Sequence, residues 1–311
     1  MRYCFDIETN GFLDDCTTVH CIVLKNIDTN EILKPTNEEA IKLLSEADLI
    51  TGHNIIKFDI PVLEKLFGFK TKAQIFDTIV ATRLLFPDIR DSDFKRNDFP
   101  ANCIGRHSLK AWGYRVGNYK EAFDTDWKTF SPAMLDYCVQ DVEVTHSLFK
   151  MIENRGYSKQ AMELEHNVAS LIFRQEQHGF TFDKEKAQQL YSKLNARRAE
   201  LEEEFQKLFK PITTKRISPK TGKQLKDKIT VFNPSSRLHI ADRLKTKYNW
   251  QPDVYTSDGK PKLDDTILSK LDYPEAKLLA EHFLLDKRIG QLATGAQAWL
   301  KNETNGKIHG T

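Results

Sequence analysis

The chain has 311 residues, 40% of them hydrophobic, which is enough to bury a sizeable core and more typical of two domains than of one. Its 46 Lys and Arg residues against 44 Asp and Glu residues give a net charge of +2, which excludes a strongly basic nucleic-acid binder of the histone kind. Any basic footprint for nucleic acid must therefore be local.

The cysteines are scattered and form no C-x-x-C pair, which argues against a zinc site or a redox centre. The N-terminus has no apolar signal region, and no apolar run is long enough to span a bilayer. We therefore expect a soluble, cytoplasmic protein. Its thiols should be reduced and mostly buried, at Cys4, Cys16, Cys21, Cys103 and Cys138.

The first half of the chain alternates short strands with helices, which predicts an α/β domain around a central sheet. A turn at Asn10-Gly11 and a hairpin turn at 28–30 punctuate the first strands, and Asn37 is placed to cap the first helix. We expect strands near 3–7, 21–24, 49–51 and 75–76, and helices near 37–47, after Pro61, at 78–85 and at 132–152.

Long helical patterns replace this alternation beyond about Gly156. The predicted architecture is thus an α/β domain over 1–155, followed by a mainly α-helical domain over 156–311. Between the helices lies a segment at 210–228 that is rich in Lys and Arg and has few apolar anchors, so we expect a mobile basic loop there.

Two acids, Asp6 and Glu8, stand two residues apart on the first predicted strand, so both side chains point to the same face of the sheet. Like charges this close raise each other's pKa unless a cation neutralises them. Hard oxygen ligands suit magnesium or manganese. Such a pair alone is a weak signal, because a solvated strand edge also explains it.

Two further segments supply acids. Asp59 stands at a helix entrance after the strand at 49–51, where it is a candidate ligand or merely an N-cap. Tyr137 and Asp141 lie one turn apart on a predicted helix, so a hydroxyl and a carboxylate share one face. Singly each segment has a structural explanation, and the case for a catalytic site depends on their joint order and spacing.

Together these five residues resemble the DEDDy exonuclease superfamily, which has an RNase H-like mixed sheet with flanking helices. The resemblance implies two divalent ions, Mg²⁺ or Mn²⁺, and 3′→5′ phosphodiester hydrolysis that releases nucleoside 5′-monophosphates. It implies that Asp6, Glu8 and Asp141 ligate one metal, that Asp6 bridges to the second, and that Asp59 holds that second metal mainly through water. Tyr137 would orient the nucleophile.

A histidine-based subclass of the same superfamily places a histidine five residues before the last acid. Here that position is Asp136, so the tyrosine version is favoured. Candidate contacts to the DNA strand are Thr9, Asn10 and Phe12, directly after the first motif, and His53 and Asn54. For Phe12 a place in the core is equally open, and for His53 an ordinary packing role.

Five segments resemble the corresponding regions of family A (DNA polymerase I family) polymerases of the T-seven-like bacteriophage type. They are residues 107–114 (HSLKAWGY), 179–183 (GFTFD), 232–237 (FNPSSR), 287–291 (KRIGQ) and 306–310 (GKIHG). The resemblance spans nearly the whole chain and implies a proofreading nuclease domain followed by a thumb-like region that holds duplex DNA, in the cytoplasm of a bacterial host.

Two departures from that family affect the expected function. The chain stops where a palm domain would begin, so we expect no polymerase activity from it alone, and a separate palm and fingers chain as a partner. It also lacks the long insertion that recruits the host's thioredoxin, so thioredoxin binding is not expected. The alternatives are a DNA-clamping or assembly subunit of a split polymerase, and an RNA-processing exonuclease of the same superfamily.

The helical half holds six further candidate DNA contacts. Lys215 and Arg216 in the basic segment could neutralise duplex phosphates, or form an ordinary solvated charge run. The others are short polar or cationic groups suited to the phosphate backbone, with a helix cap at Asn233 as the structural alternative. They are Asn233, Ser235, Ser236 and Arg237.

Overall fold

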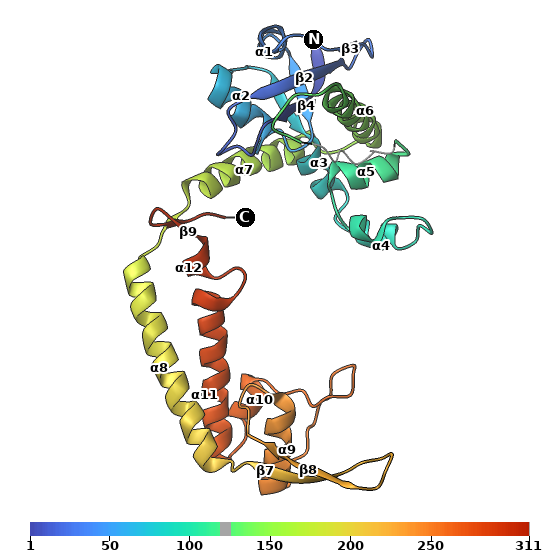
Figure 1. Ribbon diagram of the computed structural model, residues 1–311. Coiled ribbons are helices and arrows are strands. Elements are labelled where there is room, and N and C mark those ends of the chain that lie inside the picture. The colour runs from blue at the N-terminus through green and yellow to red at the C-terminus, as the bar shows by residue number, and fades with distance from the viewer. Residues whose placement is uncertain (119–125, 311) are drawn as a thin grey trace. The chain divides into compact units, whose positions relative to one another are not determined.

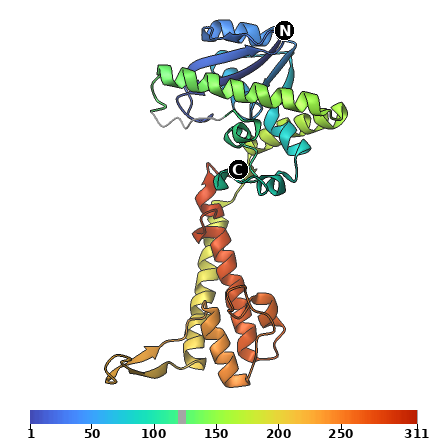
Figure 2. The same cartoon turned by 90° about the vertical axis from the view of Figure 1, so that its right-hand side faces the viewer.

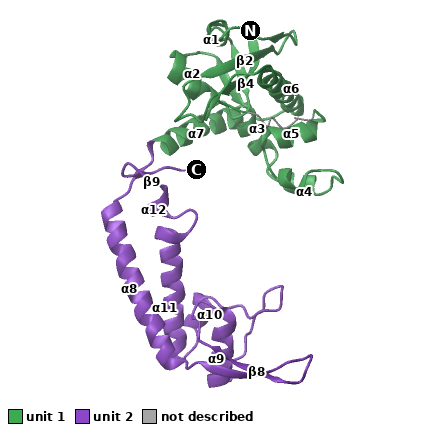
Figure 3. Cartoon of the chain, in the orientation of Figure 1, with its two compact units in different colours: residues 1–177 green, residues 178–311 purple. Residues whose placement is uncertain are grey.

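The computed structural model describes residues 1–118 and 126–310, which fall into two compact units, 1–177 and 178–311 (Figures 1 and 3). The sequence predicted a domain boundary near Gly156, before helix α7 (Lys159–His178). Contacts group α7 with the first unit, because Met162 on this helix joins the core beneath the sheet.

The first unit is built on a five-stranded sheet in the order β3-β2-β1-β4-β5. Strand β1 pairs antiparallel with β2 and parallel with β4, so the sheet is mixed, as the predicted fold class requires. Its elements are β1 (Arg2–Thr9), β2 (Val19–Asn26), β3 (Ile32–Leu33), α1 (Asn37–Ser45), β4 (Leu49–Gly52), α2 (Asp59–Phe67), β5 (Gln74–Asp77), α3 (Thr78–Leu85), α4 (Ile89–Asp93), a short 3₁₀ turn (Ala101–Cys103), α5 (Leu109–Val116), α6 (Pro132–Arg155) and α7.

Strand β1 separates two hydrophobic cores because its side chains alternate between the faces of the sheet. Tyr3, Phe5 and Ile7 pack into the core shared with α1 and α2. Cys4 packs into the opposite core, which α3, α5 and α6 cover, and Figure 2 shows α6 lying across this face. Asp6 has the same parity as Cys4, so the acids of β1 point toward α6.

The helix ends follow local rules, although one expected cap was wrong. Thr36, rather than Asn37, caps α1. It forms a capping box with Glu39, in which the side chain of each residue accepts a hydrogen bond from the backbone N–H of the other. Helix α3 has the bounds that the sequence predicted, and Asp77 caps it by accepting from the backbone N–H of Ile79.

The second unit pairs two long helices, α8 and α11, around a core that includes Phe205, Phe232 and Leu279. Ion pairs from Arg197 to Glu281 and from Arg198 to Asp286 join the two helices. Its elements are β6 (Phe180–Thr181), α8 (Lys184–Leu208), β7 (Ile212–Ile217), β8 (Gln224–Thr230), α9 (Arg237–Tyr248), α10 (Asp265–Ser269), α11 (Pro274–Ile289), a π-helical turn (Gly290–Thr294), α12 (Trp299–Asn302), β9 (Glu303–Thr304) and β10 (Lys307–Ile308).

The basic segment, for which the sequence predicted a mobile loop, contains two paired strands. Strands β7 and β8 form an antiparallel hairpin with a register shift between Thr214 and Arg216. Apolar residues recur on both strands, among them Ile217 and Ile229, and both are exposed. A Lys-rich composition concealed this β pattern, because strand propensity depends on the β-branched positions rather than on overall polarity.

Candidate active site

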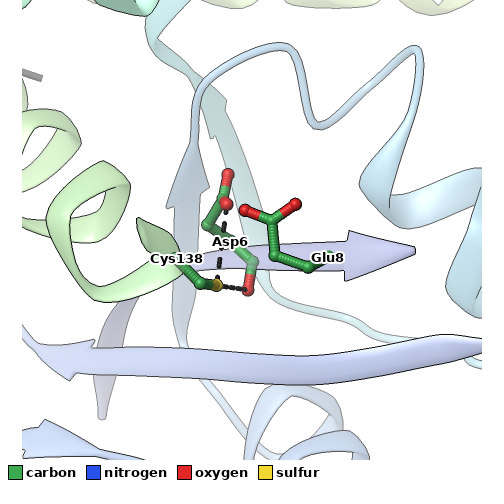
Figure 4. A group of neighbouring side chains, drawn as sticks. All are labelled: Asp6, Glu8 and Cys138. Atoms are coloured by element: carbon green, nitrogen blue, oxygen red, sulfur yellow. Dashed lines mark hydrogen bonds between the residues drawn. The ribbon is translucent and has the colours of Figure 1, made fainter. Parts of the chain in front are cut away.

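Asp6 and Glu8 lie side by side on β1 and face the start of α6 (Figure 4). Oxygen atoms of both carboxylates and the sulfur of Cys138 all lie within 4.8 Å of one another. The Cys138 thiol contacts the backbone oxygen of Asp6 at 3.5 Å and its carboxylate at 3.7 Å. Cys138 stands between Tyr137 and Asp141 on α6, so this helix brings the third predicted motif to the first.

Asp59 reaches the same place from α2. It is buried, with 4% of its surface exposed, and its carboxylate accepts a hydrogen bond from the backbone N–H of Ile7, the residue between Asp6 and Glu8. Burial, together with the negative charges of Asp77 and Asp141, raises the pKa of Asp59 to about 7. Three chain segments that are far apart in sequence thus bring acids to one end of β1.

Most of these acids are buried: Glu8 is 6% exposed and Asp141 5%. Carboxylates in so apolar a setting are costly to ionise without a compensating positive charge. The donor set is dominated by hard oxygen atoms, which suits a divalent cation such as magnesium or manganese. Cys138 is the softer exception, and burial and the nearby acids raise the pKa of its thiol well above the ordinary value.

A loop between β4 and α2 positions Asp59, and Gly52 makes this loop possible. A Cβ at Gly52 would lie 2.2 Å from the side chain of Ile55 and 2.9 Å from the backbone oxygen of Phe5. The following Asn54 adopts a positive φ of 72°, a conformation that asparagine tolerates better than most residues. The chain therefore turns back tightly over β1 before α2 begins at Asp59.

Asp77 holds this loop in place, although the sequence did not single it out. Its carboxylate accepts from the backbone N–H groups of Asn54 at 2.9 Å and Ile56 at 3.0 Å, besides capping α3. The backbone N–H of Asp77 donates to Nε2 of His166, which leaves Nδ1 as the donor to the Met162 carbonyl. Asp77 thus holds the loop that precedes Asp59, and its negative charge also contributes to the raised pKa of Asp59.

A pocket of about 440 Å³ adjoins Glu8 and has aromatic walls. Phe12, Phe58 and Trp127 line it, together with Thr9. Phe12 is 83% exposed, so it is no core residue. The sequence predicted Phe12 here but not Phe58 or Trp127, because no local pattern distinguishes these two from ordinary packing residues.

Most of the residues near β1 that were predicted to contact the DNA strand already form hydrogen bonds within the protein. Thr9 donates its hydroxyl to the Gly11 carbonyl, and Asn10 accepts from the backbone N–H groups of Thr17 and Thr18. His53 shares a hydrogen bond with the Thr78 hydroxyl at 2.8 Å. Asn10 therefore shapes the loop that presents Phe12.

Of the DNA contacts predicted in the helical unit, some are exposed and others already form hydrogen bonds within the protein. Lys215 and Arg216 are exposed on β7. Asn233 does not cap α9: its side chain accepts from the Ser235 backbone, and Ser236 is the N-cap. The remaining groups bond inward, since Ser235 donates to Asp286 and Arg237 donates to the Leu263 carbonyl.

The cysteine prediction is confirmed, because all five thiols lie in described residues and are free and buried. None of the helices in residues 1–118 and 126–310 combines the length and the apolar character needed to cross a membrane.

A family model described as the 3′-5′ exonuclease of DNA polymerase A matches residues 14–156. That match includes Asp59, Tyr137 and Asp141 and begins after Asp6 and Glu8. The chain is 30% identical to the DNA-directed DNA polymerases of Escherichia phage T7 and Enterobacteria phage T3, over 98% of its own length and 59% of theirs. The alignments run over 416 residues, so the relatives carry residues that this chain lacks.

The fold is also similar to a solved structure of the POL domain of Pol1 from M. smegmatis, with a TM-score of 0.61 and 14% identity. That likeness covers 99% of this chain and 48% of the other. Residues 14–156 are thus similar to the 3′-5′ exonuclease domain of the DNA polymerase A family, and the chain spans 59% of the length of the phage polymerases that it matches.

Proposed function

We propose that this chain removes nucleotides from the 3′ end of DNA by hydrolysis, with Asp6, Glu8, Asp59 and Asp141 as the metal ligands and Tyr137 as the residue that orients the nucleophile. The observation that carries this proposal is that acids from three separate elements gather at one end of β1. Carboxylate oxygens of Asp6 and Glu8 lie within 4.8 Å of each other, and the buried Asp59 and Asp141 are close enough for their charges to interact. The reaction class, 3′-5′ hydrolysis, is supported by the match of residues 14–156 to the exonuclease family model.

Two divalent ions bound by these acids would activate a water molecule and stabilise the charge on the leaving oxygen. The chain's own contribution is to bury the acids and to fix their positions from three elements. Asp6 and Glu8 are held by the strand pairing of β1, Asp59 by the Ile7 N–H, and Asp141 by α6. Hard oxygen donors favour Mg²⁺, and we propose that Mn²⁺ also supports activity.

Tyr137 is half-buried at the edge of this cluster, one residue before Cys138. We assign its hydroxyl the role of a hydrogen-bonding group that holds the attacking water in line with the scissile phosphate. A tyrosine hydroxyl can both donate and accept hydrogen bonds, so Tyr137 can hold the water in place without taking its proton.

The substrate proposal is a DNA strand whose terminal base enters the aromatic pocket beside Glu8. Aromatic side chains bind bases of any sequence by stacking, which suits a nuclease that removes every nucleotide in turn. An exposed Phe12 is available for such stacking. We propose that Thr9, His53 and Asn54 contact the strand mainly through their backbone, since the Thr9 and His53 side chains already have partners.

The relatives are phage DNA polymerases, so we propose that this exonuclease proofreads DNA synthesis in the bacterial host cytoplasm. The helical unit would hold the primer-template duplex, through Lys215 and Arg216 of the hairpin and through the polar groups around Ser236. The solved structure of similar fold was determined in complex with a DNA primer-template and dNTP. Thioredoxin is not a proposed partner.

The decisive experiment is degradation of a 5′-labelled single-stranded DNA oligonucleotide in Mg²⁺ or Mn²⁺. We expect a ladder of 3′-shortened products and nucleoside 5′-monophosphates, lost in EDTA and in the Asp6→Ala, Glu8→Ala double variant. An RNA oligonucleotide of the same sequence tests the sugar preference. An intact DNA oligonucleotide in both metals would overturn the proposed function and favour a clamping or assembly role.

A further inference from the structure

Trp127 lies in the turn before α6 and contacts the proposed nucleophile-orienting residue. Its ring meets the ring of Tyr137 edge-on, with centroids 6.0 Å apart and an interplanar angle of 80°. Edge-to-face aromatic pairs of this kind are favourable and directional. The orientation of the Tyr137 ring therefore depends on the place of Trp127.

The sheet fixes that place through His20. Nε2 of His20 donates a hydrogen bond to the Trp127 carbonyl at 3.0 Å, and His20 lies on β2. The next residue, Cys21, is the register partner of Glu8. The tether thus runs from the turn to the strand beside the acid cluster.

Trp127 also forms a wall of the aromatic pocket beside Glu8, with Phe12 and Phe58 among the other lining residues. Its side chain is accessible, with 39% of its surface exposed. A base in this pocket would contact the same indole that supports Tyr137. The pocket and the tyrosine therefore share one side chain.

We propose that Trp127 is a positioning and specificity-determining residue, which binds the 3′-terminal base and holds Tyr137 in its working orientation. This rests on the proposed nuclease function. An unpaired terminal base enters the pocket readily, whereas a paired base must first leave the duplex stack, which costs free energy. Trp127 therefore couples occupation of the pocket by an unpaired base to the alignment of Tyr137, and favours frayed or mismatched ends.

Steady-state hydrolysis of a single-stranded oligonucleotide tests the coupling with Trp127→Ala and Trp127→Phe. Loss of the indole should lower kcat and raise KM, each by about three- to tenfold, and phenylalanine should restore part of kcat because it keeps an aromatic edge. His20→Ala should lower kcat with a smaller change in KM. His20→Gln should restore it, because an amide N–H can replace the donor.

Trp299 offers a matched control. It is 53% exposed and meets Phe182 edge-on with centroids 6.4 Å apart, so Trp299→Ala removes a similar indole outside the proposed site. We expect no change in kcat or KM for this variant. In addition, Trp127→Ala should lower kcat little further in a Tyr137→Phe background, because the tyrosine hydroxyl is already absent.

Binding can be followed without hydrolysis. In EDTA, an oligothymidylate should quench the tryptophan fluorescence of the wild type and of Trp299→Phe, but much less that of Trp127→Phe. Equal kcat, KM and quenching in wild type and Trp127→Phe, with kcat also unchanged in Trp127→Ala, would overturn the proposal. A wild type that binds and quenches but never hydrolyses would instead count against the proposed function.

Discussion

The backbone N–H of Ile7 donates a hydrogen bond to the carboxylate of Asp59, which joins α2 to β1 between Asp6 and Glu8. Despite this bond, the pKa of Asp59 is raised to about 7, because burial and the nearby carboxylates outweigh it. The metal-free protein therefore holds a proton on Asp59 that its unfolded chain releases near the ordinary pKa of an aspartate.

A raised folded-state pKa makes this group's contribution to stability largest below about pH 4, and that contribution is lost as the pH rises toward 7. We expect Asp59→Asn in EDTA to unfold at a higher temperature than the wild type at pH 8, with a much smaller difference at pH 5. Thermal unfolding at the two pH values measures this. The exposed Asp258→Asn should show no such gain, and an equal loss at both pH values in Asp59→Asn would contradict the expectation.

Removal of a proposed metal ligand should abolish hydrolysis without unfolding the protein. We expect Asp6→Ala and Asp141→Ala to lower kcat by about a thousandfold or more, because the charge on the leaving oxygen loses its stabilisation. Melting temperatures in EDTA should not fall, since each change removes a buried or half-buried negative charge. Asp258→Ala is the control for an aspartate outside the cluster. Wild-type activity in Asp6→Ala would show that the site assignment is wrong.

Tyr137→Phe should slow the reaction while leaving the metal ligands in place. We expect kcat to fall by about 10- to 100-fold, because the phenyl ring still packs on Trp127 but cannot orient water. Titration with Mn²⁺, followed by its EPR signal, should give the wild-type affinity. Weakened Mn²⁺ binding would indicate that Tyr137 supports the ligands rather than the nucleophile.

Asp77 should matter for activity although it is not a proposed metal ligand. In Asp77→Asn the new amide N–H₂ must take the place of one oxygen that accepts from Asn54, Ile56 or Ile79. We expect a loss of about 1–3 kcal/mol in unfolding free energy and a lower kcat, as the loop that carries Asp59 loosens. Urea unfolding and hydrolysis assays measure the two effects, and unchanged kcat in a destabilised variant would limit Asp77 to a structural role.

The basic hairpin should give duplex affinity that depends on salt. We expect a Lys215→Gln, Arg216→Gln double variant to bind primer-template DNA more weakly, and to reduce the slope of log affinity against log salt by about 2 if both side chains contact phosphates. The Lys95→Gln, Arg96→Gln double variant removes the same two charges from a segment that also contains several aspartates. We expect it to change the affinity and the salt slope little. An unchanged slope in the hairpin variant would leave it an ordinary solvated charge run.

Local patterns in the sequence predicted much of the fold. Strand period placed Asp6 and Glu8 on one face, and helical period placed Tyr137 and Asp141 one turn apart; both depend only on backbone geometry. The bounds of α3 followed in the same way. Prediction from local sequence was wrong at the start of α1, where both Thr36 and Asn37 are suitable N-cap residues. It was also wrong at β7, where the many charged residues masked the strand pattern.

The sequence by itself determined which chemical groups the chain holds and which face of its own element each one occupies. Only the tertiary structure decided that Asp77 supports the loop before Asp59, that Cys138 touches Asp6, and that Trp127 lies against Tyr137. The physical reason is the range of the interactions. Periodicity and capping act within a few residues, whereas these contacts arise when α2 and α6 pack on opposite faces of the sheet.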